Sequence, residues 1–103
     1  MKKYAMASVS WNSSWTRLRI LGHYNHRVIL NSLQAQKVVL NELPGQGVDV
    51  SNYEIKNKGN GGLAFKQIVS CLLSEGWEPY ATSKDSTNEF EAEHHFRIVI
   101  DAS

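Results

Sequence analysis

The chain has 103 residues, a length that fits one domain with a single modest core, and we treat residues 1–103 as that domain. Apolar residues make up 42% and charged residues 20%, a composition that excludes a chain disordered throughout. The net charge is only +1, so the total charge does not by itself favour a nucleic-acid ligand.

The composition also indicates a compartment. No apolar run approaches the roughly 20 residues that a membrane-spanning helix needs. Ser8, Ser10 and Asn12 interrupt any apolar region that a signal peptide would require. Cys71 is the only cysteine, which rules out an internal disulfide and fits a reducing environment. We therefore expect a soluble cytoplasmic protein that does not associate with membranes.

The charges are segregated along the chain. Residues 1–41 contain no Asp or Glu and carry six basic residues, whereas the chain from Glu75 onward is mainly acidic. This asymmetry is compatible with a nucleic-acid footprint on the basic part. It is equally compatible with complementary pairing between the two halves, or between two copies. We favour pairing, because isolated basic strands in a neutral protein rarely form a phosphate-binding groove.

Two stretches near the N-terminus predict a β-hairpin. Residues 4–11 alternate between apolar and more polar positions, the period of a half-buried strand. Residues 12–14 are a cluster of turn formers. Residues 17–24 alternate again, with Leu18 and Ile20 on one side and Arg17 and Arg19 on the other.

Residues 27–43 allow two interpretations. A helix that starts after Asn25 gathers most of the apolar residues into one broad arc but leaves Leu30 and Val38 outside it. Two strands at residues 28–30 and 38–40 are rich in β-branched residues, and this favours the strands. Such strands are apolar on both faces and need cover on both. One helix cannot provide that cover, so this interpretation predicts a homodimer.

The clearest element is a helix at residues 63–75, whose apolar residues fall on one face. Residues 44–47 break the preceding element, and residues 48–57 are expected to be partly extended. Gly76 is positioned for a left-handed helix exit, after which Trp77 packs back on Leu72.

The remaining strands complete the expected fold. Residues 77–83 predict a strand, and Pro79 favours an edge position or the start of the strand. Residues 90–101 alternate cleanly and predict a strand with one buried face and one charged face. We therefore predict an α+β fold, an antiparallel β-sheet with one principal α-helix (about 63–75) packed on one face.

Three short motifs together resemble a family of small bacterial domains, the domain-of-unknown-function family 4177. They are Lys-Lys-Tyr at residues 2–4, Gly-Trp-Glu at 76–78 and His-Phe-Arg at 95–97. Some relatives of that family also carry a motif similar to Asn-Glu-Leu-Pro-Gly at residues 41–45, ahead of the helix. The chain departs from the family pattern in having Ser-Glu at residues 74–75 and a longer middle section. The resemblance implies an α+β domain with an antiparallel sheet and one main helix. It implies no activity, so no functional residue is carried over.

Histidines form the only clusters that look like metal ligands. His94 and His95 point to opposite faces of a strand and cannot share an ion. His23 and His26 could approach each other in a turn, but no Cys, Asp or Glu lies near them in sequence to complete a coordination shell. We predict no metal site and no cofactor, and we expect His94 to be a core histidine.

No motif predicts catalysis. The glycine-rich residues 58–62 lead into a helix but lack the Lys-Ser/Thr of a phosphate-binding loop. Cys71 lies on the apolar helix face, where a thiol stays inert. An enzyme is therefore less favoured than a binding protein. If the protein is an enzyme or a small-ligand binder, its pocket is expected to include His23, His26 or His94.

Tryptophan and arginine interleave in the N-terminal hairpin. Such side chains could stack on and clamp single-stranded nucleic acid, or line a ligand pocket. The alternative is that the indoles cap the core or an interface. The candidate contact residues for a ligand or nucleic acid are Trp11, Trp15, Arg17, Arg19 and Arg27.

The leading hypothesis is a small non-catalytic binding or interaction module that self-associates. The alternatives are a nucleic-acid-binding module, which would also use Lys2 and Lys3, and a small enzyme or ligand-binding protein with a histidine-containing pocket. Neither the ligand nor the biological process follows from the sequence.

Overall fold

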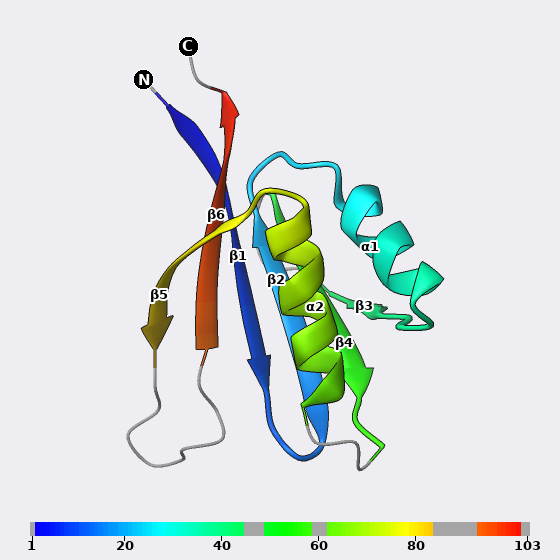
Figure 1. Cartoon of the computed structure of the whole chain (residues 1–103). Helices are drawn as coiled ribbons and strands as arrows, with labels where there is room; N and C mark the ends of the chain where they lie inside the picture. The colour runs from blue at the N-terminus through cyan, green and yellow to red at the C-terminus, as the bar shows by residue number, and fades with distance from the viewer. Residues whose placement is uncertain (1, 45–48, 59–61, 84–92, 102–103) are drawn as a thin grey trace.

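The computed structural model describes residues 2–44, 49–58, 62–83 and 93–101. Within these residues the chain forms a six-stranded antiparallel sheet, in the order β3-β4-β2-β1-β6-β5, with two helices on one face (Figure 1). The α+β prediction is confirmed. The elements are β1 (Lys3–Trp11), β2 (Trp15–Leu21), α1 (His26–Ala35), β3 (Asn41–Leu43), β4 (Val50–Lys56), α2 (Leu63–Ser74), β5 (Glu78–Ser83) and β6 (Glu93–Asp101).

The predicted hairpin is formed by β1 and β2 at the centre of the sheet. Val9 pairs with Leu18, and both are fully buried beneath the helices. At the turn, the Oδ1 atom of Asn12 accepts hydrogen bonds from the backbone N–H groups of Ser14 and Trp15, at 2.8 and 3.0 Å. A side chain that satisfies two backbone donors in this way is the property that makes asparagine a turn former.

The preference for strands at residues 28–30 and 38–40 is wrong. Residues 26–35 form α1, and only Asn41–Leu43 is extended, as β3. Asn25 caps the helix, since its side chain accepts a hydrogen bond from the backbone N–H of Arg27 at 3.1 Å. Ile29 and Leu33 are four residues apart, so they lie on one helical face, and both are fully buried. Burial of this face outweighs the β propensity of Val28 and Ile29.

The end of α1 explains why the sequence is ambiguous here. Lys37 adopts the left-handed conformation, with φ = 65°, at a position where glycine is usual. The backbone N–H of Val38 donates to the carbonyl of Leu33 at 2.8 Å, and that of Lys37 donates to Gln34 at 2.9 Å. This is a complete helix-terminating motif without its glycine signal.

Helix α2 ends through the left-handed Gly76, as predicted, but its last helical residue is Ser74, one residue before the predicted end at residue 75. Gly76 has φ = 93°, and its N–H donates to the carbonyl of Leu73 at 3.2 Å. The N–H of Trp77 donates to Leu72 at 2.9 Å, and the Trp77 side chain is buried. These bonds satisfy the last carbonyls of the helix and direct the chain into β5.

The strands after α2 also agree with the predictions. β5 is an edge strand in which every residue is exposed, and β6 pairs on one side with β5 and on the other with β1. The predicted extension of the last strand to residues 90–92 lies outside the described residues. No helix in the part of the chain that the structure describes is long and apolar enough to cross a membrane.

The two helices cover one face of the sheet and leave the other face uncovered by any helix of the described residues. Figure 1 shows α1 and α2 on the same side, and we call the opposite side the open face. The homodimer was predicted from strands at residues 27–43 whose two apolar faces one helix could not cover. In the structure α1 replaces those strands and supplies a second helix, so the fold gives no such reason to expect a homodimer.

Candidate functional site

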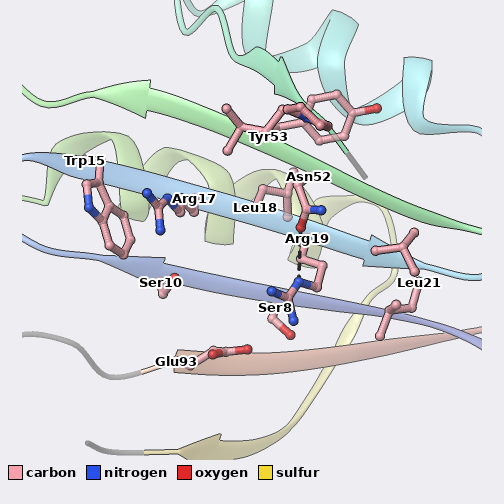
Figure 2. A pocket seen from close by; sticks show the side chains of 13 residues that line it. Ser8, Ser10, Trp15, Arg17, Leu18, Arg19, Leu21, Asn52, Tyr53 and Glu93 are labelled. Carbon is pink, nitrogen blue, oxygen red and sulfur yellow. Dashed lines mark hydrogen bonds between the residues drawn. The ribbon is translucent and has the colours of Figure 1, made fainter. Parts of the chain in front are cut away.

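The open face contains a hollow of about 610 Å³ that crosses β1, β2 and β4, which we call the trough (Figure 2). Its position follows from the strand register, because residues paired across an antiparallel sheet point to the same face. Ser8 lies opposite Arg19, and Ser10 lies opposite Arg17. Its lining includes Ser8, Ser10, Trp15, Arg17, Arg19, Leu21, Leu43, Pro44, Val50, Asn52 and Glu93.

One end of the trough holds an aromatic ring and an ion pair. The guanidinium carbon of Arg17 lies 3.9 Å from the ring centroid of Trp15. Its Nε atom donates to Oε2 of Glu54 at 2.7 Å, across the β2–β4 register. The side chain of Arg17 is 48% exposed, so the pair contributes about 1 kcal/mol or less to stability. The charge of Arg17 is therefore already compensated before any ligand binds.

The middle of the trough holds a second arginine with a neutral partner. The Nε atom of Arg19 donates to Oδ1 of Asn52 at 3.1 Å, which is the dashed line in Figure 2. No carboxylate of the described residues lies within ion-pair distance of Arg19. Its exposed guanidinium is a positive charge that a ligand can reach.

The other end of the trough is apolar. Leu21 pairs with Val50, and Leu43 on β3 lies opposite Asn52 of β4. Leu21 is exposed, and Leu43 and Val50 are half-buried. An apolar group placed here would remove their surface from water, which contributes about 25 cal/mol for each Å² buried.

A histidine beside the trough connects three strands. The Nδ1 atom of His95 lies 3.2 Å from the Ser8 hydroxyl, and its Nε2 atom lies 2.9 Å from the Ser83 hydroxyl. Glu93 approaches the same Nδ1 atom only to 4.0 Å. A hydrolytic triad needs a carboxylate hydrogen-bonded to this nitrogen, and a serine occupies that place. The arrangement links β1, β5 and β6 and does not assemble such a triad.

Three of the five predicted contact residues share the trough: Trp15, Arg17 and Arg19. Trp11 lies on the opposite face, where its ring is 6.1 Å from that of Phe65 on α2. Arg27 is exposed on α1. The period-two pattern of β2 is enough to group the first three residues. Sequence reasoning missed Asn52 and Leu43, because nothing in the sequence sets the register of β4 against β2.

The predicted histidines do not come together. His94 lies on the helix side, with its ring 4.9 Å from Phe65. His23 approaches Asp49 at 3.2 Å, whereas His26 contacts the Tyr53 hydroxyl at 3.0 Å. Among the described ranges, no group of three or more His, Cys, Asp or Glu residues could hold a metal ion.

Comparisons with known proteins support the fold alone. No protein-family model matches the chain, and no curated protein matches it. A solved structure of a conserved kinetoplastid-specific protein from Trypanosoma cruzi is similar, with a TM-score of 0.54 and 15% sequence identity. The match covers 98% of this chain and all of that one. The resemblance to the bacterial domain family is untested by these matches and stays a prediction.

Proposed function

We propose that the protein is a non-catalytic binding module whose trough takes a segment of a partner protein. The segment carries a carboxylate that pairs with Arg19 and an apolar side chain that packs on Leu21, Leu43 and Val50. The observation that carries this proposal is the guanidinium of Arg19, which lies in mid-trough and has the Asn52 amide as its one partner among the described residues.

Selectivity comes from the middle of the trough and affinity from its apolar end. A carboxylate can accept two parallel hydrogen bonds from a guanidinium, a geometry that fixes the position and orientation of the bound group. The exposed position of Arg19 limits that contact to about 1 kcal/mol. Burial of one leucine-sized side chain at the apolar end contributes roughly 1.5–3 kcal/mol. Arg19 therefore determines which segment binds, and the apolar end provides most of the affinity.

The mixed charge of the open face favours a protein segment over nucleic acid. Glu54 compensates Arg17, and Glu93 lines the trough. A phosphate backbone crossing this face would approach both carboxylates, and like charges oppose its binding. Nucleic acid is the second candidate, supported by the position of Trp15, Arg17 and Arg19 on one face.

A second copy of the chain is one possible protein partner. Residues 26–35 form a helix and not the two-sided apolar strands that predicted a homodimer, so self-association needs independent support. Mass measurement by light scattering over a range of protein concentrations tests it. A reducing, cytoplasmic location also stays a prediction, supported by the buried free thiol of Cys71.

The proposal is tested by selection from a random peptide-display library against two proteins, the wild type and Arg19→Glu. Wild type is expected to enrich peptides with Asp or Glu at a fixed spacing from Leu, Ile or Phe. Arg19→Glu is expected to lose about tenfold in affinity for these peptides, equivalent to about 1.4 kcal/mol. Arg27→Glu is the matched control, because it makes the same charge reversal on α1.

Two results would contradict the proposal. One is a set of enriched peptides that lack acidic residues, or whose affinity Arg19→Glu and Arg27→Glu reduce equally. The other is tight binding of oligothymidylate at low salt, with an affinity that falls steeply as salt is added, which would favour the nucleic-acid alternative.

A further inference from the structure

A second hollow, of about 570 Å³, lies on the helix side of the sheet, between α1 and the segment that enters β3. We call it the α1 groove. One wall is the Arg27, Leu30, Asn31 and Gln34 face of α1, and the opposite wall is formed by Val39, Leu40 and Glu42. Its size is that of a small-molecule site, which typically measures about 300–1,000 Å³. It is separate from the trough of the proposed function, because it lies on the other face of the sheet.

Two uncharged titratable groups lie at the inner end of the groove. The Nδ1 atom of His26 is 3.0 Å from the hydroxyl of Tyr53, and the two rings meet edge to face at 88°. Tyr53 is only 6% exposed. Burial lowers the pKa of His26, while Glu42 partly opposes this effect. Burial and Glu42 together raise the pKa of Tyr53. The pair is therefore neutral at physiological pH and brings no positive charge of its own.

The charge nearest to this pair is negative. Glu42 lies directly opposite Tyr53 in the β3–β4 register, which separates the Cβ atoms of the two residues by about 5 Å. Glu42 acts electrostatically on both His26 and Tyr53. In the described part of the chain, no Lys or Arg forms an ion pair with Glu42. The groove therefore presents an unpaired carboxylate beside a tyrosine ring.

The apolar wall leads away from this carboxylate. Val39 is 60% exposed, and Leu30 and Leu40 beside it are half-buried. A ligand with an alkyl body would cover these three side chains while its polar head reached Glu42.

We propose that the α1 groove binds a small organic ammonium ion with an apolar tail. The ammonium group donates hydrogen bonds to the Glu42 carboxylate and lies against the ring of Tyr53, and the tail packs on Leu30, Val39 and Leu40. Carboxylates and tyrosine rings both attract cations, and the unprotonated His26 leaves that attraction unopposed at the inner end.

The test is an NMR titration of the ¹⁵N-labelled full chain with three probes of equal length: hexylammonium, hexanol and hexanoate. Hexylammonium is expected to shift the amide signals of α1 and of residues 39–43. It should bind about fivefold more tightly than hexanol, because the exposed position of Glu42 limits this contact to about 1 kcal/mol. Glu42→Gln should remove most of this advantage, whereas Glu75→Gln, which removes the same charge after α2, should leave it unchanged.

Three outcomes would overturn the proposal. The first is tighter binding of hexanoate than of hexylammonium, which would assign the groove to an anion at Arg27. The second is an equal effect of Glu42→Gln and Glu75→Gln. The third is the absence of hexylammonium binding to a wild-type protein with a well-dispersed spectrum. A lysine side chain of a partner protein carries the same ammonium group. Tighter binding of Nα-acetyl-lysine amide, whose side-chain ammonium is free, than of hexylammonium would support the proposal and identify that source.

Discussion

Replacement of Gly76 by alanine should destabilise the protein by an amount set by the backbone alone. Gly76 has φ = 93°, and among the atoms of the described residues a Cβ atom placed there would meet only Cδ1 of Ile98, at an ordinary contact distance of 3.9 Å. A left-handed conformation costs an L-residue about 1–2 kcal/mol. The smaller entropy of the unfolded alanine chain offsets about 0.4–1 kcal/mol of this cost. We therefore expect Gly76→Ala to lower the free energy of unfolding by about 1 kcal/mol.

Gly62 gives the matched comparison, because its dihedral angle is easier for alanine but its surroundings are tighter. Its φ of 62° lies at the centre of the left-handed region. A Cβ atom there would lie 3.1 Å from Cζ2 of Trp11, whose ring packs against Phe65. Overpacking of this kind costs about 1–3 kcal/mol in addition to the backbone term. Gly62→Ala should therefore be the more destabilising variant, at about 2–4 kcal/mol.

Urea denaturation followed by far-ultraviolet circular dichroism measures both variants. The dependence of the free energy on urea should stay unchanged, since neither variant alters the surface exposed on unfolding. The melting temperature should fall by about 4–8 °C for Gly76→Ala. If Gly62→Ala is no less stable than Gly76→Ala, the result would contradict the claim that contact with Trp11 disfavours a side chain at residue 62.

Three further variants test the core and the α1 groove. Thr16→Val should cost about 1 kcal/mol by urea denaturation, because it removes the 2.9 Å hydrogen bond that the buried Thr16 hydroxyl donates to Oδ1 of Asn57. Leu72→Ala should cost about 2–5 kcal/mol in the same assay, since Leu72 is fully buried. For His26, the folded pKa lies below the ordinary value of 6.5, so the unfolded chain binds more protons as the pH falls through that value. Wild type should therefore lose stability relative to His26→Asn between pH 8 and acidic pH, and a difference that does not change with pH would contradict the burial of this ring.

The elements that the sequence predicts well are those whose local signals agree with one another. In α2, the apolar face, the glycine at residue 76 and the apolar Trp77 all point to the same helix and the same end. In the hairpin, alternation and the turn residues agree in the same way. An element can be predicted from a single sequence when its local preferences agree with the global fold in this way.

The local sequence signals in helix α1 conflict with one another. The β-branched Val28 and Ile29 favour a strand, and Lys37 takes the left-handed position after the helix that glycine usually occupies. What decides the outcome is a contact that lies 42 residues away in sequence. The thiol of Cys71 on α2 donates a hydrogen bond to the carbonyl of Ile29 at 3.8 Å, and the two helices bury each other's apolar residues. Local propensity cannot report an interaction with an element that follows so much later.

The register of β4 against β2 determines which arginine of the trough is available to a ligand. The observed register sets Arg17 against Glu54 and Arg19 against Asn52. A shift by two residues in one direction would set Arg19 against Glu54 and Arg17 against Lys56, and like charges directly opposite each other are destabilising. A shift in the other direction would separate both arginines from Glu54. The observed register therefore combines one compensated arginine with one available arginine, and electrostatics within the sheet favours it. The proposed carboxylate site at Arg19 follows from the pairing that stabilises Arg17.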